Sequence, residues 1–415
     1  MNSMGEVTII GAGIVGMCTA VTLQQRGWKV TVIDERAPGT GASFGNAGLI
    51  SIDSCIPISM PGMVKKIPGW LTDPEGPLSL RKRYLPTALP WLLQWLRSGS
   101  RKQSVLQQAR ALRALHGNAD TIYRSLLGTD VASRLIVTTG QLHVWERNQQ
   151  ADPFSAQIQA DNDVAPRLLR AHEVRELVPG ISDRISHGQL YEKNGFASTP
   201  LRLVQALLQQ FLDNGGQLVR QRVNGISRDD AYGDYRIILA TQNARASRLV
   251  ICAGAWANRL LDGLNIHAPL ETERGYHVSF DPAALALPLP IMDKTRAVAM
   301  TPMADHIRVA GFVEIAGLDV APNMSREQLL VRHAKTLFPG LDINLKKEFW
   351  LGFRPSTPDS LPVLDRVPHL PGLFLGFGHG HTGMTGAPKS AEILADLISG
   401  TASNIDITPY RLNRF

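Results

Sequence analysis

The chain has 415 residues, 44% of them apolar and 19% charged, which is the composition of a folded globular protein and excludes a disordered one. Its formal net charge of +7 is thinly spread along the chain, so the charge gives no basis for a nucleic-acid-binding function. Three cysteines without metal-ligand spacing exclude a disulfide framework and a zinc site, and we expect no other metal site.

The first 34 residues have the pattern of a nucleotide-binding βαβ unit. An apolar run over 7–10 is followed by a glycine turn, a helical pattern that Gly27 ends, and a β-branched run over 28–34 that closes on Asp34. The turn holds three glycines at the spacing of a dinucleotide fingerprint: Gly11, Gly13 and Gly16. They permit, in order, the tight turn, the approach of the backbone to a pyrophosphate, and close packing of helix on strand. We expect the pyrophosphate at the helix N-terminus and Asp34 at the ribose hydroxyls.

The fingerprint alone does not distinguish NAD from FAD, but the loop that follows does. Between positions 39 and 48 the chain has four glycines and small hydroxyl- or amide-bearing residues, which suit a flat ring lying against backbone. A nicotinamide enzyme would proceed here into another crossover unit, and none is visible. The apolar run over 49–52 indicates a buried segment rather than a flexible surface loop.

Residues 57–102 combine aromatic rings, cations and prolines. Tryptophans interleave there with basic residues, namely Trp70, Trp91 and Trp95 with Lys65, Lys66, Arg81, Lys82, Arg83, Arg97, Arg101 and Lys102. Seven prolines between Pro57 and Pro90 exclude one long helix, although 89–96 can form a short one. Packing within the fold is our first interpretation, contact with a membrane surface the second, and docking of an electron-transfer subunit the third.

Two further amphipathic patterns predict helices. Apolar residues recur at helical spacing over 105–126, and we interpret this stripe as core packing rather than a site. A second pattern over 201–212 ends at Gly215 and Gly216, and 217–223 predicts the strand that follows. No apolar stretch reaches the length of a membrane span and no signal peptide is visible, so we expect a cytoplasmic protein, with peripheral contact to the inner membrane as an alternative.

Four blocks, spread in order over nearly the whole chain, point to one enzyme family. They are the fingerprint with Asp34 and 43–50, then 249–257, then 307–317 with 349–363, and last 376–394, which contains G-H-G-H-T-G. Together they resemble the D-amino-acid oxidase superfamily of FAD-dependent oxidoreductases, most closely its bacterial D-amino-acid dehydrogenases. Glycine oxidase is a more distant relative.

The resemblance implies an α/β fold with a discontinuous, Rossmann-type FAD-binding domain over 1–52, 190–265 and 350–415. It also implies an α+β substrate domain with a large antiparallel sheet over 53–189 and 266–349.

The resemblance implies FAD as the cofactor. We expect a non-covalent complex, because no cysteine lies near the carboxy-terminal glycine turn where some relatives attach the flavin. The expected cofactor-binding residues are Gly11, Gly13, Ile14, Val15, Gly16, Asp34, Glu35, Arg36, Ala42, Ser43, Asn46, Ala47, Gly48, Leu49, Val223, Ala253, Gly254, Trp256, Gly378, Gly380, Thr382, Gly383 and Met384.

Arg354 is the first candidate for substrate binding. It matches the position at which glycine oxidase and its relatives hold the substrate carboxylate, and a guanidinium pairs with both carboxylate oxygens in a fixed geometry. The alternative is an arginine paired with an internal acid, such as Asp359 or Asp365.

Tyr276 is the second candidate, since a tyrosine hydroxyl can complete the carboxylate clamp while its ring walls the pocket. Tyrosines at strand starts are often packing residues, which remains the alternative.

His379 and His381 lie in a glycine-rich turn that opens the last predicted helix. The backbone N–H groups and the helix dipole there can stabilise negative charge on a reduced flavin. His381 stands where glycine oxidase has a second arginine, which argues against glycine-oxidase specificity. The alternative for each histidine is a structural hydrogen bond.

The resemblance implies oxidation of a small D-amino acid, with hydride transfer from Cα to flavin N5 and hydrolysis of the imine to a 2-oxo acid. Electrons would pass to a quinone or an electron-transfer protein. A D-proline or D-hydroxyproline dehydrogenase, which gives a cyclic imine, and an oxidase that uses O₂ are rivals within the class. An NAD-dependent dehydrogenase and a non-catalytic flavin-carrying subunit are alternatives from other classes.

Overall fold

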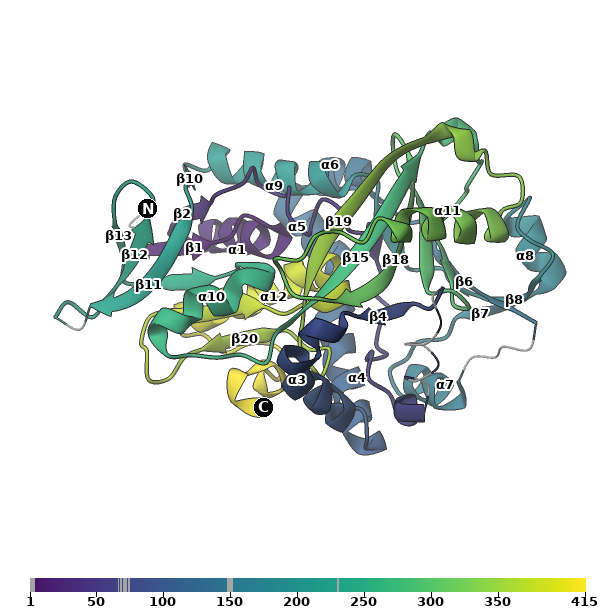
Figure 1. Ribbon diagram of the computed structural model, residues 1–415. Helices are drawn as coiled ribbons and strands as arrows, with labels where there is room; N and C mark the ends of the chain where they lie inside the picture. The colour runs from purple at the N-terminus through teal and green to yellow at the C-terminus, as the bar shows by residue number, and fades with distance from the viewer. Residues whose placement is uncertain are drawn as a thin grey trace.

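The computed structural model describes residues 4–65, 67, 69, 73, 75–147, 152–229 and 231–415. Within these residues two large sheets lie beside each other, one carrying the N-terminal helix and the other reaching to the opposite end of the molecule (Figure 1). The chain crosses between the two sheets several times, so segments far apart in sequence meet at their junction.

The first sheet has six strands among the described residues. In spatial order they are β10 (Gln217–Arg220), β2 (Lys29–Asp34), β1 (Glu6–Ile10), β14 (Leu249–Ile251), β21 (Leu373–Phe377) and β20 (Val363–Arg366). Every neighbouring pair is parallel except β20 with β21. The chain leaves β1 toward β2 on one side, while β14 lies on the other. The carboxyl end of β1 is therefore a topological switch point, where open α/β sheets bind ligands.

Helices cover one face of this sheet, and a small sheet covers the other. The helical layer consists of α1 (Ile14–Gln25), α4 (Lys102–His116), α5 (Ala119–Leu127), α6 (Thr129–Leu135), α9 (Pro200–Asp213) and α12 (Gly383–Ser399). The opposite face packs on β11 (Val223–Asp229), β12 (Asp234–Leu239), β13 (Ala244–Ala246) and α10 (Ala257–Leu261). Both layers exclude water from the strands, which accounts for their nearly continuous apolar runs.

The second sheet has nine strands within the described ranges and is largely antiparallel. In spatial order they are β19 (Lys346–Ser356), β15 (Glu271–Phe280), β18 (Ile307–Ile315), β17 (Val298–Pro302), β16 (Ile291–Asp293), β6 (Gln141–Glu146), β8 (Ile185–Tyr191) and β7 (Arg167–Arg170), with β4 (Leu78–Leu80) beside β18. Helix α11 (Ser325–Leu337) packs its apolar side on one face. The other face is turned toward the first sheet.

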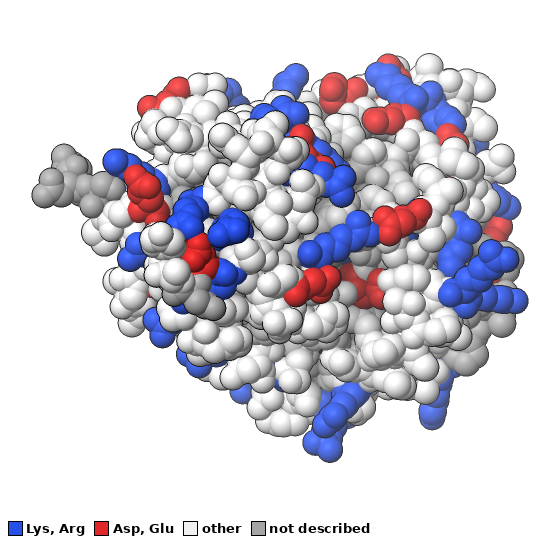
Figure 2. All heavy atoms as spheres, turned by 60° about the vertical axis from the view of Figure 1, so that its left-hand side comes forward, with Lys and Arg blue, Asp and Glu red and all other residues white. Residues whose placement is uncertain are grey.

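The other α-helices and strands of the described residues connect or flank the two sheets. They are α3 (Leu85–Ser98), α7 (Pro153–Ala160), α8 (Ala171–Leu177) and a small sheet of β3 (Leu49–Ile50), β9 (Gly195–Ala197) and β5 (Ile136–Val137). In the part of the chain that the structure describes, no helix combines the length and apolarity needed to cross a membrane. Figure 2 shows lysine and arginine side chains scattered over the visible face, with acidic side chains among them.

Most of the locally predicted elements are confirmed. Helix α1 ends before Gly27, which has a left-handed φ of 84°, and α9 follows its predicted boundaries closely. Strand β10 begins at 217 as predicted but ends at Arg220, and Val223, expected in the same strand, begins β11 instead. The stripe over 105–126 is buried as predicted, but the helix is broken at 117–118 into α4 and α5.

The short helix predicted over 89–96 is longer than expected, because α3 spans Leu85–Ser98. Pro86 lies in its first turn, where the missing N–H has no helical partner to lose. Trp91 and Trp95 are buried on its inner side, which confirms packing for these two rings, while Trp70 and Lys66 lie outside the described residues.

One expected domain boundary falls inside a strand, and one segment expected in the substrate domain packs with the other domain. Residue 350 lies within β19, which is hydrogen-bonded to β15 in the nine-stranded sheet. The segment 111–136, expected in the substrate domain, contributes side chains to the core that α1 and α12 also form. Both differences arise from packing between segments far apart in sequence.

Candidate active site

A cavity of about 1280 Å³ lies at the junction of the two sheets. Its lining includes the turn after β1, the loop over 35–47, the turn before α12, and the inward face of the nine-stranded sheet. The cavity thus begins at the switch point of the first sheet and extends beneath the second.

The glycine turn at one end of the cavity is tightly packed. Gly11 has a φ of 110°, and a Cβ there would come within 2.3 Å of the Cys252 carbonyl oxygen. A Cβ on Gly16 would lie 1.9 Å from the Gly11 carbonyl oxygen, so α1 crosses β1 at a distance that only glycine permits. A Cβ on Gly13, in contrast, would meet only the Ser43 hydroxyl at 3.5 Å, and Gly13 borders the cavity. The turn is therefore packed tightly against the protein at Gly11 and Gly16, while at Gly13 it faces the cavity.

Polar side chains fix this turn for an anionic ligand. Asp34 accepts hydrogen bonds from the backbone N–H groups of Ala12 (2.7 Å) and Arg36 (2.8 Å), while it also borders the cavity. Each carboxylate oxygen keeps a further lone pair, with which it can accept from ribose hydroxyls. Ser43 accepts from the N–H of Ile14 at 3.0 Å. The other N–H groups of the first turn of α1 have no partner within the helix and make an anion-binding end.

Most of the expected cofactor-binding residues border this one cavity. The exceptions are Gly16, Gly48 and Gly378. Gly48 and Gly378 have left-handed φ values of 77° and 88°, and a Cβ on either would contact neighbouring atoms within 3 Å. These three glycines shape the backbone behind the cavity.

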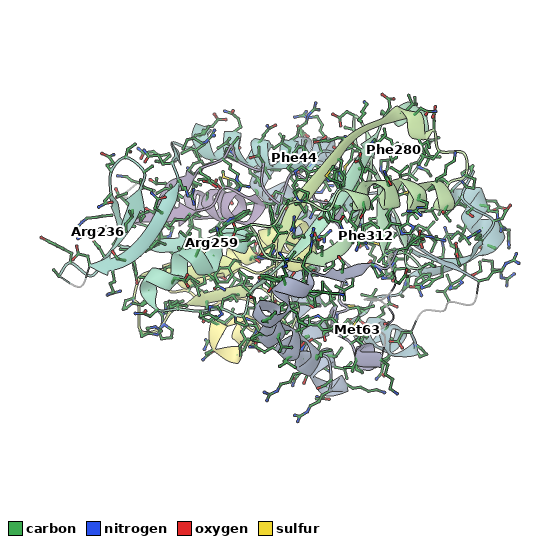
Figure 3. The ribbon with its side chains drawn as sticks, in the orientation of Figure 1. Phe44, Met63, Arg236, Arg259, Phe280 and Phe312 are labelled. Atoms are coloured by element: carbon green, nitrogen blue, oxygen red, sulfur yellow. The ribbon has the colours of Figure 1, made fainter. Side chains whose placement is uncertain are left out.

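Arg354 extends across the inward face of the nine-stranded sheet. A Cβ on Gly275, on the neighbouring strand β15, would lie 2.2 Å from the Arg354 guanidinium carbon, so the arginine occupies the space above that glycine. Its Nη1 donates a hydrogen bond of 2.9 Å to the Phe312 carbonyl oxygen on β18. Phe312 lies near the centre of the molecule (Figure 3).

The acids proposed as internal partners of Arg354 are engaged elsewhere. Asp359 pairs with Arg414 at 2.7 Å, and Asp365 accepts from the backbone N–H of Leu412 at 2.9 Å. Within the described residues no carboxylate lies within 4.0 Å of the Arg354 guanidinium. Burial lowers the pKa of Arg354, and the through-space attraction of Glu273 opposes this effect. Arg354 thus presents a positive charge to the cavity with most of its N–H groups unused.

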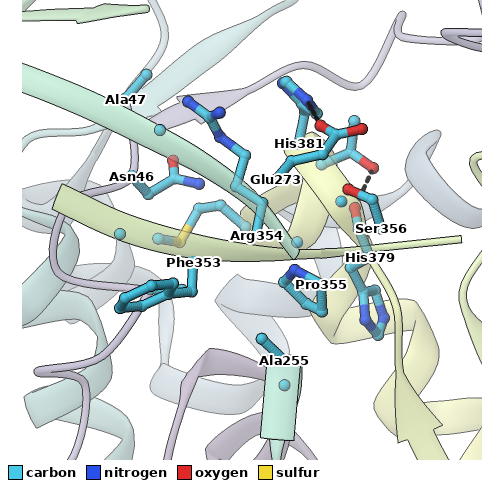
Figure 4. Close-up of a pocket in the computed structure, with 18 of the residues that line it drawn as sticks. Asn46, Ala47, Ala255, Glu273, Phe353, Arg354, Pro355, Ser356, His379 and His381 are labelled. Carbon is cyan, nitrogen blue, oxygen red and sulfur yellow. Dashed lines mark hydrogen bonds and ion pairs between the residues drawn. The ribbon is translucent and has the colours of Figure 1, made fainter. Parts of the chain in front are cut away.

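Glu273 and His381 form a close pair beside this arginine (Figure 4). His381 Nε2 lies 2.5 Å from Glu273 Oε2, and Glu273 is directly opposite Arg354 in the β15–β19 ladder. Burial alone would raise the pKa of Glu273, but His381 and Arg354 outweigh it and hold the pKa below its usual value. Glu273 is therefore an anion at neutral pH.

Tyr276 borders the cavity, but its hydroxyl is engaged with the protein. It donates a short hydrogen bond to Glu314 and accepts one of 3.0 Å from the backbone N–H of Asn323. A phenol has one proton to donate, so the hydroxyl has none left for a carboxylate in this conformation. Its ring stacks on Phe349 with centroids 5.6 Å apart, as a packing residue does.

His379 is directed into α12 rather than toward Arg354. Its Nε2 lies 2.8 Å from the Ser390 hydroxyl, and burial lowers the pKa of His379 to about 3. The ring is neutral and anchors the glycine turn to the helix. Gly380, Thr382, Gly383 and Met384 in and after this turn border the cavity.

Sequence reasoning did not single out Glu273, Gly275 or Phe312. Glu273 and Gly275 are two residues apart on one strand, and this spacing predicts that both lie on the same face of the sheet. However, nothing local shows that β19 pairs with β15 and brings Arg354 above Gly275. Phe312 contributes only its carbonyl group, which side-chain patterns do not reveal.

The FAD expected from the sequence fits these residues. The glycine turn leaves backbone N–H groups and open space before Gly13, Asp34 keeps free lone pairs, and the cavity continues from there to Arg354. The residues of the turn before α12 border the same space as the loop over 42–49. A dinucleotide bound at the turn after β1 can therefore extend its ring toward the nine-stranded sheet.

Comparisons with known proteins agree with this geometry. The sequence model of the DAO family, described as FAD dependent oxidoreductase, matches residues 6–397. The chain is 36% identical to a D-amino-acid oxidase of Bradyrhizobium diazoefficiens over 99% of both chains. It is 31% identical to a D-amino acid dehydrogenase of Rhizobium rhizogenes over 99% of this chain and 100% of that one. The crystal structure of glycine oxidase from Geobacillus kaustophilus shares the fold, with a TM-score of 0.72 and 22% identity over 99% of this chain and 98% of that one.

Proposed function

The chain belongs to the DAO family of FAD-dependent oxidoreductases and is an FAD-dependent amino-acid oxidoreductase, and from this premise we propose that it oxidises small D-amino acids. The two similar curated proteins are named for D-amino acids, which supports the proposed configuration. A D-proline or D-hydroxyproline substrate, which would give a cyclic imine, belongs to the same proposal and is separated by experiment.

One set of residues would bind the cofactor, and another would bind the substrate. The glycine turn, Asp34 and Ser43 would hold the dinucleotide, and the residues after His379 would border its ring. Bound FAD supplies the acceptor for a hydride from Cα, after which water hydrolyses the imine to a 2-oxo acid and ammonia. Arg354 orients the amino acid by its carboxylate, and orientation is most of what this chain must contribute.

The cavity-facing guanidinium of Arg354 is the observation that carries the proposal. Arg354 is half-buried and has one backbone acceptor, so its desolvation is costly unless an anion completes its hydrogen bonds. A substrate carboxylate supplies that anion in bidentate geometry. Glu273 offsets part of the positive charge and is itself held by His381, so the site keeps one position for an incoming carboxylate.

We further propose that the electrons pass to a quinone at a membrane surface, where α3 makes contact. Leu85, Leu89 and Leu93 follow one another at helical spacing on its outer side and are 41%, 46% and 58% exposed. Exposed cations flank them at Lys82 and Arg97. The inner side of α3 borders the active-site cavity through Trp91 and Trp95. Apolar residues with flanking cations suit an anionic membrane interface.

Anaerobic titration of the flavin tests the substrate proposal. Holoenzyme is mixed without oxygen with D- and L-amino acids, glycine, sarcosine and hydroxyproline isomers, and the flavin band near ~450 nm is followed. We expect small D-amino acids to bleach it and their L-enantiomers not to. Arg354→Leu should retain FAD but lower kcat/KM by about two to four orders of magnitude, because the charge-assisted clamp is lost.

Arg236→Leu serves as the matched control, because Arg236 is exposed on β12 at the far end of the molecule (Figure 3). Bound FAD that no amino acid bleaches would instead indicate a flavin-carrying subunit without catalytic activity. A normal KM in Arg354→Leu would remove this arginine from the substrate site.

A further inference from the structure

Besides Arg354, the nine-stranded sheet presents a further cation, Lys294, to the active-site cavity. Lys294 borders the cavity at the start of the turn that joins β16 to β17, and its backbone N–H donates to the Val144 carbonyl oxygen at 3.0 Å. The side chain keeps an accessible surface, yet burial among the surrounding atoms lowers its pKa. The accessible part of Lys294 therefore belongs to the cavity wall.

Among the described residues, no acid pairs with Lys294. The neighbouring acids are both taken by Arg296, whose Nη1 lies 2.8 Å from Asp293 and whose Nη2 lies 2.6 Å from Glu146. In the described ranges Lys294 has neither an ion pair nor a side-chain hydrogen bond. The Lys294 ammonium is accessible from the cavity and is left without a partner by the described side chains, so it is free to pair with an anion that enters from outside the chain.

A neutral donor lies beside this lysine. His143 borders the cavity on β6, directly opposite Met292, two residues before Lys294. Burial, together with the charge of Lys294, holds the pKa of His143 well below its ordinary value. Lys294 therefore carries the positive charge of this pair, and the neutral His143 imidazole can donate a further hydrogen bond to an anion bound at Lys294.

The sheet register places Lys294 level with the acceptor of Arg354. Asp293 pairs with Val298, and Val298 pairs with Gly311. The next residues on these three strands are Lys294, Ala297 and Phe312, whose carbonyl oxygen holds Arg354. Adjacent strands lie about 4.8 Å apart, so about 10 Å separates the backbone at Phe312 from that at Lys294.

The floor between the two cations is made of small residues. Ala297, Ala299 and Gly311 border the cavity between Lys294 and Arg354, and Gly275 lies below the guanidinium. A ligand with two carboxylates can therefore pair with the Arg354 guanidinium at one end and with the Lys294 ammonium at the other.

We propose that Lys294 binds a second carboxylate of the substrate, so that the enzyme prefers D-amino acids with an acidic side chain, such as D-glutamate. The inference rests on the proposed function, because it assigns the α-carboxylate to Arg354. The side-chain carboxylate lies over the small residues and reaches Lys294, with His143 beside it. Monocarboxylic amino acids bind through Arg354 alone.

Binding of an unreactive diacid tests this assignment apart from turnover. Glutarate and butyrate are titrated into the holoenzyme by calorimetry, with wild type, Lys294→Gln, Lys294→Arg and Lys347→Gln. Lys347 is an exposed lysine paired with Asp281 at 3.0 Å and serves as the matched control. We expect glutarate to bind wild type at least tenfold more tightly than butyrate, and Lys294→Gln to lose that preference while Lys294→Arg keeps most of it.

Turnover provides the second readout. In wild type kcat/KM should be higher for D-glutamate than for D-glutamine, and Lys294→Gln should reduce this ratio by about ten- to hundredfold with D-alanine changed less than threefold. If D-alanine is oxidised but glutarate binds no better than butyrate, or Lys294→Gln leaves the ratio unchanged, the proposal is overturned. If no amino acid is oxidised while glutarate still binds through Lys294, the proposed reaction fails and the anion site stands.

Discussion

At the scale of single residues, the position of Arg354 depends on what lies below it. Gly275 provides the space for the guanidinium, and the Phe312 carbonyl oxygen accepts its hydrogen bond. Phe312 has a φ of 64°, in the left-handed region that costs a non-glycine residue about 1–3 kcal/mol. This backbone geometry lies opposite a register shift in β15 between Arg274 and Tyr276. The two strands are therefore irregular at the point where Arg354 is held.

Gly275→Ala should displace the arginine without changing its charge. The added Cβ would lie 2.2 Å from the guanidinium carbon, so Arg354 must move, and a misplacement of about 1 Å can cost on the order of a hundredfold in rate. We expect kcat/KM to fall by one to two orders of magnitude with FAD retained, measured by steady-state kinetics and flavin absorbance.

The matched control for this substitution is Gly225→Ala on β11. Its Cβ would contact only the Ile238 side chain, at an ordinary 3.6 Å. Unchanged kinetics in Gly275→Ala would show that the guanidinium does not need the position seen here.

At the scale of elements, the sequence predicts the units whose signals are local. The glycine fingerprint, α1 with Gly27, and α9 with β10 are all encoded within about thirty residues and are found at the expected places. The carboxy-terminal glycine turn likewise leads into α12. A confirmed element of this kind needs no knowledge of what it packs against.

Elements whose identity depends on distant partners are less predictable. The Glu273–His381 pair joins residues 108 positions apart, and Arg354 reaches Phe312 across an intervening strand. The Tyr276 hydroxyl is bound by Glu314, which shares no local motif with it. Sequence patterns predicted which residue types occur near the site, but strand pairing decides which of them face one another.

Helix α3 carries a prediction at this scale. The double variant Leu89→Gln/Leu93→Gln removes two exposed apolar side chains from its outer side without touching Trp91 or Trp95. If this side contacts a membrane, binding to vesicles of anionic phospholipid should weaken about tenfold or more, as measured by cosedimentation. Turnover with a soluble dye acceptor should stay unchanged.

The control for α3 is Leu168→Gln, because Leu168 is an exposed leucine outside α3, on β7 at the edge of the nine-stranded sheet. Wild-type protein that remains in the supernatant with anionic vesicles would contradict the membrane proposal and favour a protein acceptor.

At the scale of the whole molecule, the cavity exists because two sheets meet without filling the space between them. The first sheet contributes backbone N–H groups at the switch point after β1, and the second contributes charged side chains on one face. Neither sheet alone has both an anion-binding turn and Arg354. The interleaved chain order thus brings the dinucleotide site and the carboxylate site into one cavity.

Several imidazoles are buried in the fold, and the pKa values of three of them predict how the protein responds to acid. Burial lowers the pKa of His116 to about 4 and that of His277 and His379 to about 3. Between about pH 6.5 and pH 4 these groups accept protons in the unfolded chain but not in the folded one. The free energy of unfolding therefore falls as the pH is lowered through this window, by up to about 1.4 kcal/mol per pH unit for each histidine.

The apparent midpoint of thermal unfolding, measured at one scan rate from pH 7 to pH 4.5, should accordingly drop steeply. His116→Gln removes one of these proton-binding groups, so the unfolding midpoint should fall less steeply with pH. The glutamine amide can still donate to the Ser54 carbonyl oxygen, which the His116 ring contacts at 2.7 Å, so the hydrogen bond is retained. His369→Gln, at an exposed position, should leave the slope unchanged. A midpoint that stays level over this range would mean that the buried imidazoles take up protons without unfolding, and that the junction between the sheets is more open to water than the packing of His116 and His379 indicates.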